Sequence, residues 1–180
     1  GVPRRPEVDV PAGARGRELT TECPNILDLD LGTNGSLVLV HQLKPHRCSV
    51  WTSNGDSLPG WGTRDAPATW GPLDHRNRLL ELRRDSAPLL RRFDGEKLVL
   101  EHVLGGHDGK VVAGAFAADG RVLTIGVDGT ARVWSNGTDR TELVLRGFDE
   151  ELRAGAFLGE HHALLVSIST IHRFDLRGVT

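Results

Sequence analysis

A repeat of about forty residues runs through most of this chain and constrains its fold more than any other feature. The segment 112–116 reads Val-Ala-Gly-Ala-Phe, and 41 positions later the segment 153–157 reads Arg-Ala-Gly-Ala-Phe. An aromatic residue also ends a strand-like stretch in every unit, at Trp51, Phe93, Trp134 and Phe174. Aromatic residues make up only 5% of the chain, so this spacing indicates an internal repeat and not chance.

Within one unit the sequence predicts four short strands and no helix. In the third unit the apolar runs 111–117, 121–126, 131–134 and 141–145 are separated by turn residues. Asp119-Gly120 and Asp128-Gly129 stand between runs, and Asp-Gly pairs favour hairpins because glycine accepts the positive φ of a tight turn. Four short strands per forty residues are typical of a propeller blade, so the predicted fold class is all-β.

The third unit resembles the WD40 repeat. Gly106-His107 is followed, after twenty residues, by the segment 128–134, Asp-Gly-Thr-Ala-Arg-Val-Trp. The other units are more degenerate, and the resemblance covers roughly residues 17 to 177. It implies a β-propeller of WD40-like four-stranded blades, with about four blades encoded and third strands ending near residues 51, 93, 134 and 174.

The resemblance also implies a buried hydrogen-bond network in the third unit, formed by His107, Thr124, Asp128 and Trp134. The indole donates, the threonine hydroxyl relays, and the aspartate orients the imidazole. A fully satisfied buried network rigidifies a fold, so its role is structural and not catalytic. The other units lack the full set, and we expect them to rely on apolar packing alone.

The two ends of the repeat region predict how the blades are distributed. The segment 17–21 resembles the outer strand at 141–145, whereas few residues follow Phe174. We therefore expect three complete blades and a fourth that is shared between the two ends. Residues 1–16 are rich in Pro, Arg and Gly without a packing pattern, so they are assigned to a linker or disordered segment, and residues 17–180 to the blades.

Three assemblies remain open, because four blades are at the low end of propeller sizes. The chain closes on itself, forms the C-terminal arc of a larger propeller, or pairs with a second copy as a homodimeric eight-bladed ring. The absence of methionine favours the second, with an upstream domain or further blades. The bias toward Arg over Lys suggests a bacterial coding sequence, and bacterial repeats of this kind often follow a signalling or defence module.

Composition and motifs exclude several function classes. A net charge of −2 argues against nucleic acid, and no apolar run is long enough to span a membrane. The two cysteines are expected to be free thiols in a cytoplasmic protein. His161, His162 and His172 lack the spacing of a zinc site, so no metal is expected. No phosphate loop or nucleophile motif is present, so we expect no cofactor.

Two rival functions have specific residues behind them. A propeller hydrolase or lyase would use channel carboxylates, for which Asp28, Asp30 and Asp74 are candidates. Alternation places Asp28 and Asp30 on one face of a strand, about 7 Å apart. A lectin-like sugar binder would need an exposed aromatic residue, for which Trp61 is the candidate.

The preferred function is a non-catalytic scaffold or sensor domain that binds a protein or peptide. Binding surfaces on such a scaffold lie in the loops between strands. The expected partner-binding rim consists of Asp108, Lys110, Arg132, Glu150 and Glu151. The segment 86–92 is predicted to form a long inserted loop beside it, with a solvated basic patch at Arg83-Arg84 and Arg91-Arg92.

Overall fold

The computed structural model describes residues 26–31, 37–42, 48–52, 56, 58, 68–83 and 86–177. These residues form fourteen strands and no helix, so within this part of the chain none could cross a membrane as a helix. The predicted linker 1–16, the predicted outer strand 17–21 and the candidate sugar-binding Trp61 lie outside the described residues.

The strands form four antiparallel sheets in chain order. The first contains β1 (Ile26–Leu31), β2 (Leu37–Gln42) and β3 (Cys48–Thr52). The second contains β4 (Ala68–Leu73), β5 (Arg78–Arg83), β6 (Leu89–Phe93) and β7 (Leu98–Val103). The third contains β8 (Val111–Phe116), β9 (Val122–Gly126), β10 (Ala131–Trp134) and β11 (Thr141–Leu145). The fourth contains β12 (Ala154–Leu158), β13 (His162–Val166) and β14 (Ile171–Asp175).

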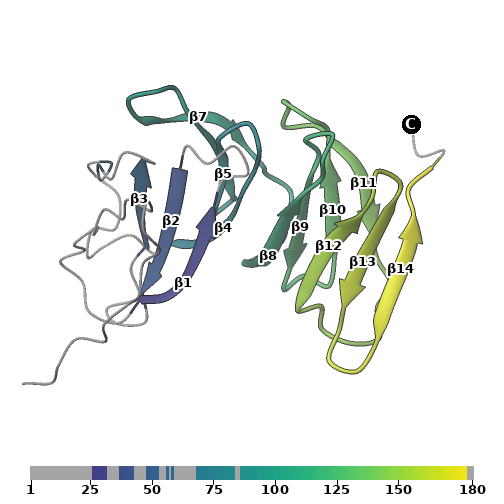
Figure 1. The fold of residues 1–180 in the computed structure, drawn as a ribbon. Helices are drawn as coiled ribbons and strands as arrows, with labels where there is room; N and C mark the ends of the chain where they lie inside the picture. The colour runs from purple at the N-terminus through teal and green to yellow at the C-terminus, as the bar shows by residue number, and fades with distance from the viewer. Residues whose placement is uncertain are drawn as a thin grey trace, which may run out of the picture.

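The four sheets follow one another as an arc. The first strand of each sheet packs beside the first strand of the next, which joins β1 to β4, β4 to β8 and β8 to β12. The first and fourth sheets lie at opposite ends of the arc (Figure 1), so the ring is open across the residues that the structure describes. This arrangement of consecutive antiparallel sheets, with up to four strands each, confirms the predicted all-β propeller architecture.

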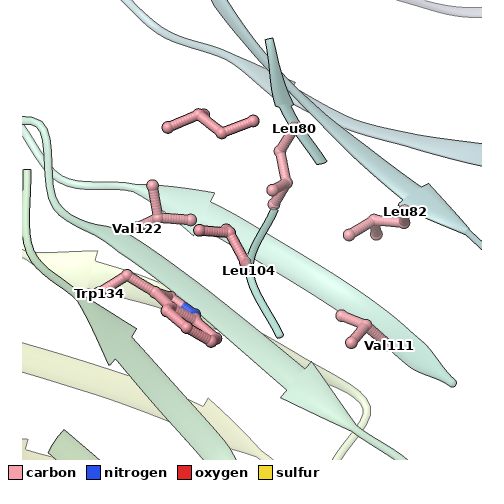
Figure 2. Close-up of a cluster of buried hydrophobic side chains, with 7 residues drawn as sticks. Leu80, Leu82, Leu104, Val111, Val122 and Trp134 are labelled. Carbon is pink, nitrogen blue, oxygen red and sulfur yellow. The ribbon is translucent and has the colours of Figure 1, made fainter. Parts of the chain in front are cut away.

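Apolar side chains fill the space between neighbouring sheets. Leu80 and Leu82 of the second sheet meet Val122 and Trp134 of the third (Figure 2), and the Trp134 side chain is fully buried. Leu90 of the second sheet belongs to the same cluster. Comparable clusters join the first sheet to the second and the third to the fourth. Successive side chains of a strand point to opposite faces of its sheet, and in the second and third sheets each of these faces packs against a neighbouring sheet. The core of this molecule is therefore a series of interfaces between sheets.

The repeated glycine of the innermost strand allows this close packing. A Cβ atom on Gly114 would collide with the side chain of Leu80 from the preceding sheet. A Cβ atom on Gly155 would lie 2.7 Å from Cδ1 of Ile125, again from the preceding sheet. The Ala-Gly-Ala-Phe repeat therefore reflects one packing requirement that recurs in consecutive blades.

An arginine clamp adds a polar contact to two of these interfaces. Arg78 donates to the carbonyl of Gly120 at 2.7 Å and lies over the Phe116 ring, with Cζ 5.2 Å from its centroid. One sheet further on, Arg121 donates to the carbonyl of Glu160 and lies over the Phe157 ring at 5.6 Å. Each arginine follows the first hairpin turn of one sheet and contacts the corresponding turn and inner-strand phenylalanine of the next.

Aspartates hold both arginines in position. The Asp74 carboxylate accepts Nε of Arg78 at 2.7 Å and also the backbone N–H groups of Arg76 and Arg78. Both side chains of this ion pair are almost completely buried. Asp119 holds Arg121 in a more exposed pair at 2.8 Å. Asp74, one of the candidate channel carboxylates, is thus occupied by a structural ion pair.

The segment 86–92 corrects one sequence prediction. It was expected to be a long loop with a basic patch, but β6 begins at Leu89 and continues through Arg91 and Arg92. Arg91 pairs with Glu81 at 2.6 Å, and Arg92 pairs with Glu101 at 2.7 Å. Two charged residues at the end of an apolar pair resemble a loop in the sequence, whereas acidic residues on the neighbouring strands neutralise them in the sheet.

Candidate binding edge of the third and fourth sheets

One edge of the molecule gathers most of the residues that the sequence singled out. We use the name loop edge for the segments 104–110, 127–130, 146–153 and 167–170, which lead into β8, β10, β12 and β14. Antiparallel pairing places the starts of β8 and β10 beside the ends of β9 and β11, so these segments share one edge of the third sheet. The same reasoning applies to the fourth sheet.

The structure brings His107, Thr124, Asp128 and Trp134 together in one chain of hydrogen bonds. Trp134 Nε1 donates to Thr124 Oγ1 at 2.8 Å, and Thr124 Oγ1 lies 2.8 Å from His107 Nε2. His107 Nδ1 lies 3.1 Å from both carboxylate oxygens of Asp128. This geometry fits a neutral imidazole that donates from Nδ1 to Asp128 and accepts the threonine proton at Nε2.

Asp128 also closes the two neighbouring turns. Its carboxylate accepts the backbone N–H groups of Asp108 and Thr130 at 2.9 and 3.0 Å, and the Thr130 hydroxyl at 2.9 Å. A single carboxylate therefore ties the loop entering β8 to the turn before β10. Loops that are fixed in this way present their exposed side chains from a rigid support.

The network changes the pKa values of its two titratable members. Burial lowers the pKa of His107 below its ordinary value, and this effect outweighs the contact with Asp128 that raises it. Burial of Asp128 by itself raises the pKa of that carboxyl, but the hydrogen bonds from Asp108, Thr130 and His107 together hold it at about 2. A neutral histidine beside an ionised aspartate is the state that satisfies every hydrogen bond described above.

Gly126 is a further member of this site that the sequence analysis missed. A Cβ atom at this position would collide with His107 Nδ1 and would lie 2.5 Å from Asp128 Oδ1. Its backbone leaves the space that the imidazole and the carboxylate occupy. The residue ends the apolar strand β9, where glycine is unfavourable without such a reason.

The expectation that the other units rely on apolar packing alone is wrong. In the fourth sheet, Glu150 accepts Ser167 Oγ at 2.6 Å, Ser169 N at 2.9 Å and Ser169 Oγ at 2.5 Å. The hydrogen bonds from Ser167 and then from Ser169 lower the pKa of Glu150 to about 2. In the second sheet, Glu81 pairs with Arg91. The second, third and fourth sheets thus each have a polar arrangement of their own, built from different residues.

The five predicted rim residues lie on or reach the loop edge, but in different environments. Asp108 and Lys110 are exposed, whereas the Glu150 carboxylate is held by the serines of the 167–170 turn. Glu151 is exposed and pairs with Arg153 at 3.2 Å. The Arg132 side chain reaches Gly106, where an added Cβ atom would lie 2.8 Å from Nη1, and its buried Nε has no hydrogen-bond partner.

Exposed apolar residues complete the loop edge, and the sequence analysis did not identify them. Val127 is 49% exposed in the turn before β10, and Ile168 is 65% exposed in the turn before β14. Val103, at the end of β7 just before the loop that enters β8, is 48% exposed. Large apolar side chains on a rigid edge, mixed with the charges of Asp108 and Lys110, are typical of a surface that binds another molecule.

The hollows beside these residues do not resemble a small-molecule site. A cavity of about 190 Å³ on the loop edge is lined by Glu150, Ser167 and His172 among others, below the size of most ligand pockets. His172 packs edge-on against Phe148, with ring centroids 5.3 Å apart, and His162 contacts Arg173 on the opposite edge. In the described part of the chain, no group of three potential ligands could hold a metal ion.

Asp28 and Asp30 both lie on β1, where they pair in register with His41 and Leu39. The structure therefore places them at alternate positions of an innermost strand. Asp74 lies in a different sheet and is held by Arg78. A hollow of about 410 Å³ near Asp74, on the edge opposite the loop edge, is also lined by Leu73 and Phe116.

Known proteins resemble this chain in structure but not in sequence. No family model and no curated protein sequence matches the chain. Among solved structures, the computationally designed Ika8 protein matches with a TM-score of 0.64 at 19% identity, over 86% of this chain and 47% of that one. The designed Ika4 protein matches at 0.65 and 19% identity, over 90% of this chain and 99% of that one.

The C-terminal WD40 domain of Sif2 matches with a TM-score of 0.66 at 15% identity, over 86% of this chain and 44% of the domain. The chain thus spans about half the length of Ika8 and of the Sif2 domain. The similarity extends over most of the present chain and agrees with the repeat seen in the sequence. The chain therefore has a WD40-like β-propeller fold.

Proposed function

We propose that this protein is a non-catalytic scaffold that binds a protein or peptide through its loop edge. The observation that carries the proposal is the exposure of Val127, which lies next to the loop of Asp108 and Lys110, and of Ile168 in the corresponding turn of the fourth sheet. Binding sites for proteins combine apolar anchors with a polar rim in this manner. The WD40-like fold supports the same function in general terms.

The polar groups that the structure describes favour a structural over a catalytic use. A catalytic acid or base needs access to substrate and a pKa suited to proton transfer. Asp128 and Glu150 instead have low pKa values, because several donors hold each carboxylate in its ionised form. Asp74 is buried against Arg78. These carboxylates fix loops and sheets, which is what a rigid binding surface requires.

The proposal is tested by selecting peptides against the purified chain and measuring the affinity of the best one by fluorescence anisotropy. We expect Val127→Glu to weaken binding at least about tenfold, because a charge replaces a central apolar contact. Ile168→Glu should have a similar effect. Leu100→Glu is the matched control, since Leu100 is also half-exposed but lies on β7, away from the loop edge.

Equal loss of affinity in all three variants would point to a general disturbance of the fold. Unchanged affinity in the two loop-edge variants would show that the peptide binds elsewhere and would overturn the proposal. Hydrolysis of the selected peptide by the wild-type chain, with a rate that Asp28→Asn or Asp30→Asn abolishes, would favour the rival enzyme.

A further inference from the structure

The fourth sheet has one face packed against the third sheet and one face that no described residue covers. The strand register places Ala156, Leu164, Val166 and Ile171 on this second face, together with Leu158. Ile171 is 68% exposed and Leu158 is 49% exposed. We call this surface the terminal face. Its exposed apolar side chains stand on the same face as Arg173 and Asp175, which alternate with the half-buried residues of β14.

The terminal face repeats a surface that is covered one sheet earlier. Leu123 and Ile125 of β9 and Ala131 of β10 are completely buried between the third and fourth sheets. In the fourth sheet the same register positions hold Leu164, Val166 and Ile171, since Val166 pairs with Ile171 as Ile125 pairs with Ala131. Their residue types therefore match a face that receives a following sheet.

The polar part of the interface is also repeated. Arg121, which reaches from the third sheet into the next, has His162 as its counterpart 41 positions on. The guanidinium of Arg173 lies at this same end of the fourth sheet, with Nη2 3.0 Å from His162 Nε2. An arginine thus stands at the edge of the terminal face where a clamp contacts the following sheet in the two described interfaces.

The first sheet lies at the other end of the arc (Figure 1). In each interface, the aromatic residue of a third strand packs toward the preceding sheet, as Phe93, Trp134 and Phe174 do. Trp51 occupies this position in β3, and the register pairs it with Val38 of β2. The third strand of the first sheet therefore repeats the aromatic position that meets the preceding sheet in the three described interfaces.

We propose that the terminal face binds the first sheet of a second copy of this chain, so that two arcs close into one eight-bladed ring. The same fold in the Ika8 protein has about twice the length of this chain, which covers 47% of it. Two copies related by a two-fold axis would make the contact twice, with every sheet then covered on both faces. A contact that closes after two copies gives a finite ring and no filament.

The first test is the mass of the purified chain, measured by light scattering and by sedimentation over a range of concentrations. The proposal predicts a species of twice 19.6 kDa. Ile171→Glu should raise the dissociation constant of this dimer at least about 100-fold, because a carboxylate would be buried without a partner at both contacts. Leu158→Glu is a second variant on the same face, and Leu100→Glu on β7 is the matched control.

A tandem protein, with two copies joined by a flexible linker, tests the closure of the ring. At every concentration the tandem protein should have the mass of one tandem molecule, and it should give the same small-angle scattering profile as the dimer. A wild-type monomer at all concentrations, a dimer that both terminal-face variants leave intact, or open polymers of the tandem would each overturn the proposal. The loop edge is a separate surface from the terminal face. If Val127→Glu loses peptide binding but keeps the mass of the dimer, the result bears on the proposed function and not on the closure of the ring.

Discussion

His107 is the residue on which the loop edge most depends. It links Thr124 and Trp134 in the sheet to Asp128, which in turn holds the two neighbouring turns. The imidazole is neutral in this network, since protonation at Nε2 would replace an acceptor of the Thr124 proton by a second donor. Protonation therefore disturbs the hydrogen bonds on which the geometry of the edge relies.

The pH dependence of stability follows from the direction of this pKa shift. The folded-state pKa of His107 lies below its unfolded value of 6.5, so the unfolded state binds the proton more readily. Its contribution to stability is complete above pH 6.5 and declines as the pH falls below it. Thermal unfolding should show a larger loss between pH 7.5 and pH 5 for the wild type than for His107→Gln. Parallel curves for the two proteins would contradict the assignment.

Gly126 provides a steric test of the same network. Gly126→Ala should reduce the free energy of unfolding by about 1–3 kcal/mol, because its Cβ atom would overlap the imidazole and the carboxylate. Gly105→Ala is the control, since an added Cβ atom there meets nothing within 4 Å. Urea titration of both variants measures the difference. Equal stability of the two would show that the network tolerates displacement.

The third unit shows why some of these residues were predictable and others were not. The four members of its network follow from a resemblance in which residue type and spacing coincide. No pattern in the sequence marks Gly126, because a side chain at this position is excluded only when His107 and Asp128 are in place. Glu150 joins two loop segments as Asp128 does, but it stands before the first strand of its sheet and Asp128 stands before the third. Its contacts with Ser167 and Ser169 form only when the chain has folded.

At the scale of strands and sheets, the arginine clamps join elements that the hydrophobic pattern alone would leave independent. Arg78 and Asp74 are buried together at the interface of the second and third sheets, whereas Arg121 and Asp119 are partly exposed. A buried charge that loses its partner is costly, while an exposed pair contributes little.

This difference predicts unequal effects of the same substitution. Arg78→Met should lower the free energy of unfolding by about 3–5 kcal/mol, because the Asp74 carboxylate would remain buried without its cation. Arg121→Met should cost about 1 kcal/mol or less. Chemical denaturation of both variants measures the contrast, and restoration of stability by adding Asp74→Asn to Arg78→Met would identify the uncompensated charge as the cause. Similar losses in both variants would contradict this account.

Strand positions were predictable where turn residues mark them. The strands of the third unit were expected at 111–117, 121–126, 131–134 and 141–145, and the observed bounds differ by at most one residue at either end. The second unit was harder, because Arg91 and Arg92 resemble a loop. Their acidic partners, Glu81 and Glu101, lie on neighbouring strands and become relevant only when the sheet has formed.

At the scale of the whole molecule, the repeat predicts the blades but not how they close. Contacts within a blade join residues that are close in sequence, and the 41-residue period is visible for that reason. Closure of a ring depends on the angle between successive sheets and on the complementarity of the two ends, which no local pattern encodes. The open arc (Figure 1) emerges only from the assembled sheets, and so does the exposure of Leu158 and Ile171 on the last of them.

The central claim is that the loop edge binds a partner while the rest of the arc supports it. Hydrogen–deuterium exchange with and without a selected peptide tests it most directly. We expect protection of the segments 104–110, 127–130 and 167–170, because their backbone N–H groups lie at the exposed edge. The turn at 117–121, on the opposite edge, should exchange equally in both states. Protection of that turn with no change at the loop edge would contradict the account.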